Sequence, residues 1–296
     1  MAPASKAQLA AEERRQQREL RWQRLLLVGA AYVVVGIAIV ISLTPFVWML
    51  STALKEGPEI LVLPPYLIPK RLAWENFAAV LEKAPFVRFF LNSLVQGVAS
   101  TFTTVMLAAM MGYVFAKYRF PGRDLLFLMV LSSLMLPEIV RVIPVYLMIT
   151  DWGWQDTYTA LIVPELVTGF AVFLMRQFML GVPDELIDAA RIDGASELRI
   201  WAQIVLPLCA PALAALTIFR FTHNWDNFLW PLVVIQRPDM RTVPLGLALF
   251  QGEYQTVAYH HAMAATLIAI LPVVIIFLLL QGQFIRGIAL TGLREG

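Results

Sequence analysis

Two opposite charges stand inside one of the apolar stretches of the chain. Glu138 and Arg141 lie within Leu125 to Thr150, three positions apart, so on a helix they share a face and are close enough to pair. Pro137 and Pro144 flank them, which predicts a broken helix. Charges in an apolar segment either stabilise each other or line a polar pathway, and both alternatives remain open.

Other polar side chains interrupt the apolar stretches in the same way. Asn92 and Gln96 suit helix–helix hydrogen bonds as well as solute contact. Trp225, Phe228 and Trp230 suit stacking on a sugar ring as well as anchoring at a membrane interface. The candidate pathway residues are Asn92, Gln96, Glu138, Arg141, Asn224, Trp225, Asp226 and Asn227.

The patterns of an enzyme are absent from the sequence. There is no G-x-x-x-x-G-K-[ST] phosphate loop, no H-E-x-x-H and no nucleophile elbow. His223, His260 and His261 have no further ligands at metal spacing, and Cys209 is the single cysteine. The sequence therefore predicts a chain that is not an enzyme and that holds no metal or cofactor.

Long apolar runs dominate the 296 residues, of which 59% are hydrophobic and 15% charged. A membrane span needs about 20 apolar residues. Uncharged runs at 25–54, 89–116 and 262–285 meet this length, and weaker candidates at 125–150, 157–175 and 206–235 carry polar groups. We therefore expect an all-α, polytopic membrane protein with six transmembrane helices.

The distribution of Lys and Arg predicts the orientation. Six spans place both termini on one side, which then holds fourteen of these residues against seven on the other. The positive-inside rule puts the richer side in the cytoplasm. The net charge of +2 gives no reason to expect a nucleic-acid partner.

This topology divides the chain into segments. We expect a cytoplasmic leader at 1–24, a permease domain at 25–286 and a cytoplasmic tail at 287–296. The outer loops are expected at 55–87 and 236–261, and an ordered cytoplasmic loop at 182–206. The first apolar run is too long for a signal peptide, so it is expected to remain as a span.

The cytoplasmic loop has the pattern of a helix-turn-helix. Pro183 suits a first helical position, Gly194 suits the left-handed end of the first helix, and Ser196 suits the N-cap of the second. Leu186, Ala189 and Ala190 are expected on one face of the first helix, and Leu198, Trp201, Ala202 and Val205 recur at helical spacing along the second. Its acidic residues favour a protein partner over the alternative of anionic lipid headgroups.

The spacing in this loop resembles a known family. Asp188-Ala189-Ala190, Gly194, Ile204 and Leu206-Pro207 match the EAA loop of binding-protein-dependent ABC importer permeases, with Asp188 where the family usually has Glu. The stretches "LMLPEIVRVIPVYL" and "NWDNFLWPL" resemble the second permease subunit of the carbohydrate branch, which includes the maltose and glycerol-3-phosphate importers.

The resemblance implies partners and contact sites. It implies a second homologous permease, two ATP-binding subunits that hold ATP and Mg, and an extracytoplasmic solute-binding protein, all at the cytoplasmic (inner) membrane lipid bilayer. The implied ATPase-coupling residues are Asp188, Ala189, Ala190, Gly194, Ile204, Leu206 and Pro207. The implied contacts with the binding protein are Gln251, Gly252, Glu253, Tyr254 and Gln255, where a plain linker is the alternative. The implied tail contacts with the ATPase are Leu290, Thr291, Gly292 and Leu293, where packing on the chain's own cytoplasmic face is the alternative.

The expected function is therefore that of a permease subunit that moves a carbohydrate by alternating access, driven by ATP hydrolysis in its partners. Import of sn-glycerol-3-phosphate or another polyol-type solute is the alternative within the class. An ion-coupled secondary transporter is the alternative from another class.

Overall fold

The computed structural model describes residues 6–83, 85–252 and 259–292. In these ranges every regular element is a helix, which confirms the expected all-α fold. The chain divides into two compact units, Met1–Ala73 and Trp74–Gly296.

The first unit consists of one long helix and a loop. Helix α1 (Lys6–Ala53) contains a stretch, Gln23–Ala53, that is long and apolar enough to cross a membrane. Its apolar side chains are exposed within the unit, as suits a helix that faces lipid.

The loop that follows α1 is tied to the end of that helix. After the short 3-10 helix η1 (Gly57–Glu59), the chain returns so that the Leu67 carbonyl accepts a hydrogen bond from Ser51. The Tyr66 carbonyl accepts one from the Lys55 ammonium in the same way. These contacts hold the proline-rich segment against the end of α1.

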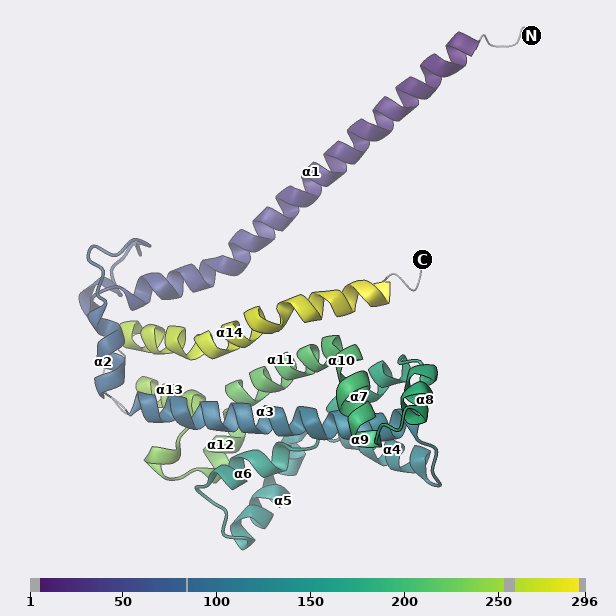
Figure 1. The fold of residues 1–296 in the computed structure, drawn as a ribbon. Coiled ribbons are helices and arrows are strands. Elements are labelled where there is room, and N and C mark those ends of the chain that lie inside the picture. Colours follow the sequence, from purple (N-terminus) through teal and green to yellow (C-terminus); the bar gives the residue numbers. More distant parts are fainter. Residues whose placement is uncertain (1–5, 84, 253–258, 293–296) are drawn as a thin grey trace. The chain divides into compact units, whose positions relative to one another are not determined.

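The second unit is a bundle of helices (Figure 1). Its elements in chain order are α2 (Glu75–Lys83), α3 (Phe86–Lys117), α4 (Arg123–Ser132), η2 (Ser133–Met135), α5 (Glu138–Asp151), α6 (Tyr158–Ile162), η3 (Val163–Glu165), α7 (Gly169–Leu180), α8 (Asp184–Ile192), α9 (Glu197–Ile200), the π-helix η4 (Trp201–Val205), α10 (Leu206–Leu208), α11 (Ala210–Asp226), α12 (Leu229–Val234), η5 (Pro238–Met240), α13 (Val243–Gly252) and α14 (Tyr259–Gly292).

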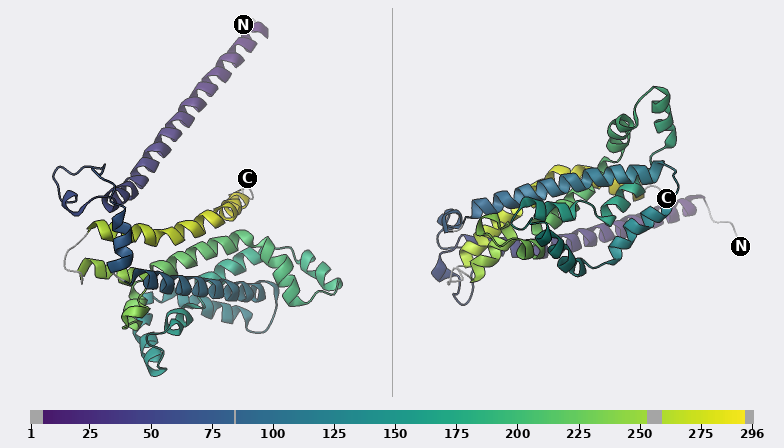
Figure 2. Two further views of the ribbon diagram at one scale, coloured as in Figure 1. Left: turned by 60° about the vertical axis from the view of Figure 1, so that its left-hand side comes forward. Right: turned by 90° about the horizontal axis from the view of Figure 1, so that it is seen from below.

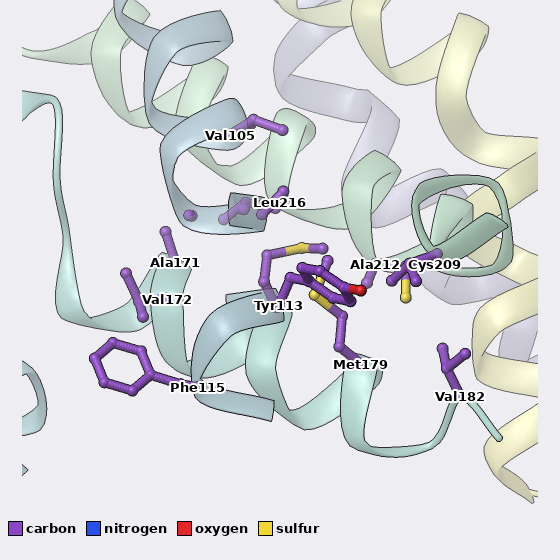
Figure 3. Close-up of a cluster of buried hydrophobic side chains, with 14 of the residues drawn as sticks. Val105, Tyr113, Phe115, Ala171, Val172, Met179, Val182, Cys209, Ala212 and Leu216 are labelled. Carbon is purple, nitrogen blue, oxygen red and sulfur yellow. The ribbon is translucent and has the colours of Figure 1, made fainter. Parts of the chain in front are cut away.

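Helix α3 is the centre of this unit. It packs along α7 and α11, and α11 packs against α14. At Gly112 of α3 an added Cβ would lie 2.8 Å from Met175 Cβ and 2.9 Å from the Arg176 backbone nitrogen of α7, so only glycine allows this approach. Figure 3 shows Tyr113 of α3 gathered with Met179 and Cys209 in the apolar core around this contact.

The membrane spans fall into two kinds. Within the described residues, three continuous helices are long and apolar enough to cross a membrane: Gln23–Ala53, Phe86–Lys117 and Tyr259–Ile285. The other three candidates are bent pairs: Arg123–Met135 with Glu138–Asp151 at 103°, Tyr158–Glu165 with Gly169–Leu180 at 47°, and Glu197–Leu208 with Ala210–Asp226 at 81°. The expected count of six requires each bent pair to be one span. The break predicted beside Glu138 is present at Leu136–Pro137, whereas Pro144 lies inside α5.

Candidate functional site

Helices α8 and α9 form the predicted helix-turn-helix, and they protrude at one end of the second unit in both views of Figure 2. Gly194 has φ +80°, as predicted. Its N–H donates to the Arg191 carbonyl at 3.0 Å, and the Ala195 N–H donates to the Ala190 carbonyl at 3.0 Å. This pair of bonds is a Schellman motif, which ends α8 with its last carbonyls satisfied. Pro183 is the N-cap of α8, one residue before the predicted position.

The two faces of α8 differ. Ile187 and Ala190 are buried in the apolar core of the unit, so Ala190 does not share one face with Leu186 and Ala189, contrary to the prediction. Leu186 and Ile192 are exposed, the latter by 87%, and Ala189 and Asp188 lie beside them on the exposed side. Exposed apolar side chains grouped on a protruding helix are typical of a protein interface.

The second helix begins as predicted and then departs from regular α geometry. Ser196 caps α9, its hydroxyl accepting from the Arg199 N–H at 3.4 Å. Of the residues predicted to recur at helical spacing, Val205 is buried and Trp201 is half-buried, whereas Leu198 is 64% exposed and Ala202 is exposed, so the four do not form one buried face. From Trp201 onward the π-helix η4 has a wider turn, which shifts the residues after it away from the 3.6-residue pattern.

The structure places the remaining predicted coupling residues where η4 and α10 return to the core. Ile204 and Leu206 are half-buried and Pro207 is exposed. The Trp201 indole N–H donates to the Ala109 carbonyl of α3 at 3.4 Å. These residues therefore connect the protruding helices to the bundle.

Glu197 joins the helix pair to α3. Its Oε2 accepts from the Tyr113 hydroxyl at 3.1 Å and also from the Tyr118 hydroxyl. Its Oε1 accepts from Arg191 Nε at 2.7 Å, and Arg191 also reaches Asp188 Oδ1 at 3.0 Å. The hydrogen bond to Glu197 raises the pKa of the Arg191 guanidinium, which stays charged. One carboxylate thus connects α8, α9 and the end of α3.

Lys117 fixes the start of α8 in the same way. Its ammonium donates to Asp184 Oδ1 at 2.6 Å and to the Val182 carbonyl. The hydrogen bond from Lys117 lowers the pKa of the Asp184 carboxyl. The start of α8, like its end, is thereby attached to the C-terminal end of α3.

A second polar cluster lies at the bend between η3 and α7. Arg220 of α11 pairs with Glu165 at 2.9 Å, and both side chains are nearly buried. His223 Nε2 lies 3.7 Å from the same carboxylate. Arg220 also donates to Asn224, which donates to Thr101 of α3 at 3.1 Å. This network joins three spans.

Of the two alternatives left open for Glu138 and Arg141, the structure does not support the ion pair. No ion pair between them occurs in the described ranges, where the buried pair is Arg220 with Glu165. The break at Leu136–Pro137 makes Glu138 the first residue of α5, and both side chains are exposed. They line a hollow together with Glu165 and Trp230.

The other candidate pathway residues separate into two groups. Asp226 and Asn227 line an open pocket of about 430 Å³ that also includes Glu138. Gln96, Asn224 and Trp225 are buried, and the Trp225 indole donates to the Ala269 carbonyl at 2.9 Å, so these three do not face that pocket. The buried position of Trp225 also fits neither of its predicted roles, stacking on a sugar or anchoring at the membrane interface.

Asn92 is a structural contact between helix and loop. It is fully buried, its amide donates to the Asp239 carbonyl at 2.8 Å and the Arg241 carbonyl at 2.9 Å, and its oxygen accepts from Tyr158 at 2.7 Å. These contacts use its hydrogen-bonding capacity within the chain, so the structural alternative for Asn92 is the better supported.

His223 is not the isolated group that the sequence suggested. Ligand atoms of Glu138, Glu165 and His223 lie within 4.8 Å of one another. The sequence did mark Glu165 and Arg220, because each is a charge in an apolar stretch. It could not predict that they pair, since they lie 55 positions apart and no spacing rule relates residues so distant. The Glu165 carboxylate is already compensated by Arg220, so, within the described residues, Glu165, Arg220 and His223 form an ion-pair network, and Glu138 lies beside it without pairing.

The predicted contacts with the binding protein and those of the tail with the ATPase fall at the limits of the described residues. Gln251 and Gly252 end α13, and Leu290, Thr291 and Gly292 end α14. Glu253, Tyr254, Gln255 and Leu293 lie outside the described residues.

Comparison with known proteins gives consistent results. The family described as "Binding-protein-dependent transport system inner membrane component" matches residues 104–290. The chain is 36% identical to the arabinooligosaccharides transport system permease protein AraQ of Halalkalibacterium halodurans, over 93% of this chain and 97% of that one. It is 35% identical to the sn-glycerol-3-phosphate transport system permease protein UgpE of Escherichia coli O1:K1, over 89% of this chain and 96% of that one.

A solved structure shares the fold. It is a bacterial ABC transporter involved in the import of the acidic polysaccharide alginate, with a TM-score of 0.77, 22% identity, and coverage of 89% of this chain and 98% of that one. Because the family match spans more than half of the sequence and the relatives align along nearly its whole length, the chain belongs to the binding-protein-dependent transport system inner membrane components, which are transport permeases and not enzymes.

Proposed function

We propose that this chain is a permease subunit of an ABC importer and that it moves a carbohydrate by alternating access. The observation that carries the proposal is the near full-length similarity to a permease named for arabinooligosaccharides. The helix pair α8–α9 adds physical support. A permease driven by ATP hydrolysis in a separate subunit needs a rigid protruding element for that subunit to contact, and α8–α9 is such an element.

The partners that we propose follow from that role. The exposed face of Leu186, Ala189 and Ile192 is suited to a groove on an ATP-binding subunit. Two such subunits hold ATP and Mg, so this chain carries no cofactor of its own. A second homologous permease completes the pathway, and an extracytoplasmic binding protein delivers the solute, as the family description implies.

The proposed location is the cytoplasmic membrane, with α8 and α9 on the cytoplasmic side and both termini on that side as well. Support comes from the charges at the α8–α9 end of the second unit. The end of α3, the turn into α4, helix α7 and the pair α8–α9 carry Lys117, Arg119, Arg123, Arg176, Arg191 and Arg199. Positive residues gather at cytoplasmic ends.

Two further contacts belong to this proposal. Residues Gln251 to Gln255 follow the apolar body of α13 and are proposed to meet the binding protein. The tail that includes Leu290, Thr291, Gly292 and Leu293 continues from α14 and is proposed to meet the ATP-binding subunits. Both rest on the sequence, since the structure describes these segments only in part.

Two other functions are tested against this one by the same experiment. Import of sn-glycerol-3-phosphate is favoured by the second relative, and an ion-coupled transporter would need no ATP-binding partner. The test is uptake into proteoliposomes that hold this chain alone, or the chain with its second permease, ATP-binding subunits and binding protein. We expect ATP-dependent uptake only from the complete assembly, whereas ion-gradient-driven uptake by the chain alone would contradict the proposal.

A further inference from the structure

The open pocket between α5, α11 and α12 has a lining that suggests which solute it accepts. It has a volume of about 430 Å³ and lies among the start of α5, the end of α11 and the start of α12. Its residues are Glu138, Ile139, Thr222, His223, Asp226, Asn227, Phe228 and Leu229. It adjoins the hollow that Glu138 shares with Arg141 and Glu165.

The acidic side chains in and around this pocket differ in whether a cation pairs with them. Glu138 and Asp226 are exposed carboxylates, and no ion pair in the described part of the chain involves either of them. Glu165 is compensated by Arg220 at 2.9 Å. Arg141 lines the neighbouring hollow and does not line this pocket. Among the described residues, no Lys or Arg pairs with the Glu138 or Asp226 carboxylate, so the pocket presents two carboxylates without a cationic partner from either residue type.

The neutral residues add hydrogen bonding and one apolar face. Asn227 is nine-tenths buried, and its Oδ1 accepts from the Trp230 N–H at 3.2 Å. Its Nδ2 has no partner among the described residues. A buried amide donor without an acceptor is costly, and an oxygen supplied by a bound solute would remove that cost. Phe228 is 39% exposed, which leaves part of an aromatic ring for the C–H face of a sugar.

Neutral sugars and anionic solutes respond oppositely to such a pocket. An ionised carboxylate only accepts hydrogen bonds, so Glu138 and Asp226 suit the hydroxyl donors of a sugar and repel a phosphate or uronate group. The names of the related proteins do not decide this point, since they include an uncharged oligosaccharide, a phosphate ester and an acidic polysaccharide.

We infer that this pocket is a solute contact site of the chain for a neutral, hydroxyl-rich saccharide, with Glu138 and Asp226 as its hydrogen-bond acceptors, and that it disfavours anionic solutes. The inference rests on the proposed role of the chain as an importer permease. It adds the charge class of the solute and the two residues that select it.

The first test is the charge of the natural solute. The probe is the compound released from the purified cognate binding protein and identified by mass spectrometry. The inference predicts an uncharged saccharide, and a phosphorylated or uronic compound would overturn it.

The second test uses variants of the complete assembly in proteoliposomes, with the same compound as the transported probe. The near-isosteric changes Glu138→Gln and Asp226→Asn remove the charges, and Asp151→Asn is the control, an exposed carboxylate at the other end of α5. Loss of a hydrogen bond to a charged group predicts uptake reduced on the order of tenfold in the double variant. ATP hydrolysis stimulated by the binding protein should persist in all variants, since the helix pair is unchanged.

The outcomes distinguish failure of the proposed function from failure of the solute contact site. If the unaltered assembly shows no ATP-dependent uptake, the proposed function fails. If it transports and the double variant transports equally well, the contact site fails while the function stands. If the double variant does not assemble, the single variants and the charge of the released compound decide.

Discussion

Arg191 Nε lies 2.7 Å from Glu197 Oε1 across the Gly194 turn, so an ion pair closes α8 against α9. The same carboxylate accepts from Tyr113 and Tyr118 at the end of α3. In the proposed docking, a displacement of α8 would be passed through these contacts to α3, as well as along the backbone into α11. Both side chains of the pair are more than a third exposed, so its value lies in geometry more than in stability.

Substitution of Glu197 should weaken coupling. Glu197→Gln keeps an acceptor for the tyrosines but loses the charge, and Glu197→Ala loses every contact, so we expect a partial and then a larger fall in solute carried per ATP hydrolysed. The measurement is the ratio of uptake to ATP hydrolysis in the reconstituted assembly, with Asp151→Asn as control. Equal ratios in the two Glu197 variants and the unaltered chain would contradict this role.

Gly194 should require its left-handed conformation. Nothing lies within 4 Å of an added Cβ, so the cost of Gly194→Val is conformational, about 1–2 kcal/mol at φ +80°. We expect the variant to insert in the membrane but to lose coupled uptake, and Gly194→Asn to retain more, because Asn tolerates this conformation. Gly153→Val, at φ +68° in another turn, is the matched control. Normal uptake and ATPase association in Gly194→Val would refute the prediction.

The buried pair of Arg220 and Glu165 should be intolerant of single changes. Arg220→Met leaves a nearly buried carboxylate whose one remaining ion-pair partner among the described residues is His223, and breaking such a pair costs about 3–5 kcal/mol. The double variant with Glu165→Gln should recover much of the loss, because no uncompensated charge remains. Thermal unfolding of the purified chain measures this. The exposed pair Arg237–Asp239 supplies the control Arg237→Gln, which should change stability by about 1 kcal/mol or less. Equal unfolding temperatures for single and double variants would argue against the pair.

The approach of α3 to α7 should forbid a side chain at residue 112. In Gly112→Ala the new Cβ meets Met175 Cβ at 2.8 Å and the Arg176 nitrogen at 2.9 Å, atoms at or next to the α7 backbone that cannot simply move aside. Overpacking of this kind costs about 1–3 kcal/mol. Gly282→Ala in α14, where nothing lies within 4 Å, should be neutral in the same unfolding measurement. A Gly112→Ala chain as stable as that control would show that the helices adjust.

Local chemistry explains what the sequence could predict. The positive φ at Gly194 and the cap at Ser196 depend on a few adjacent residues, so both were predictable. The break before Glu138 was predictable from Pro137 for the same reason. The π-helix η4 was not predictable, because it has no simple sequence signature.

Contacts between spans that are far apart in the chain could not be predicted from the sequence. Glu165 and Arg220 each stood out as a charge in an apolar stretch, but their pairing depends on how the bent span packs on α11. Glu138 and Arg141 were adjacent on a helix face and yet do not pair, because each faces open space at the start of α5. Tertiary packing, and not proximity along a helix, decided both outcomes.

The most direct test of the central claim, that the α8–α9 pair is the docking element for an ATP-driven partner, is a cross-link from its exposed face. Cys209 is buried, so Ala189→Cys introduces a single accessible thiol on that face. A short thiol-reactive cross-linker should join it to the ATP-binding subunit in the assembled complex and stop ATP-driven uptake, while Gln236→Cys, exposed on the outer side of the proposed topology, should give no such product. Absence of any product with Ala189→Cys, in a complex that transports normally, would contradict the claim.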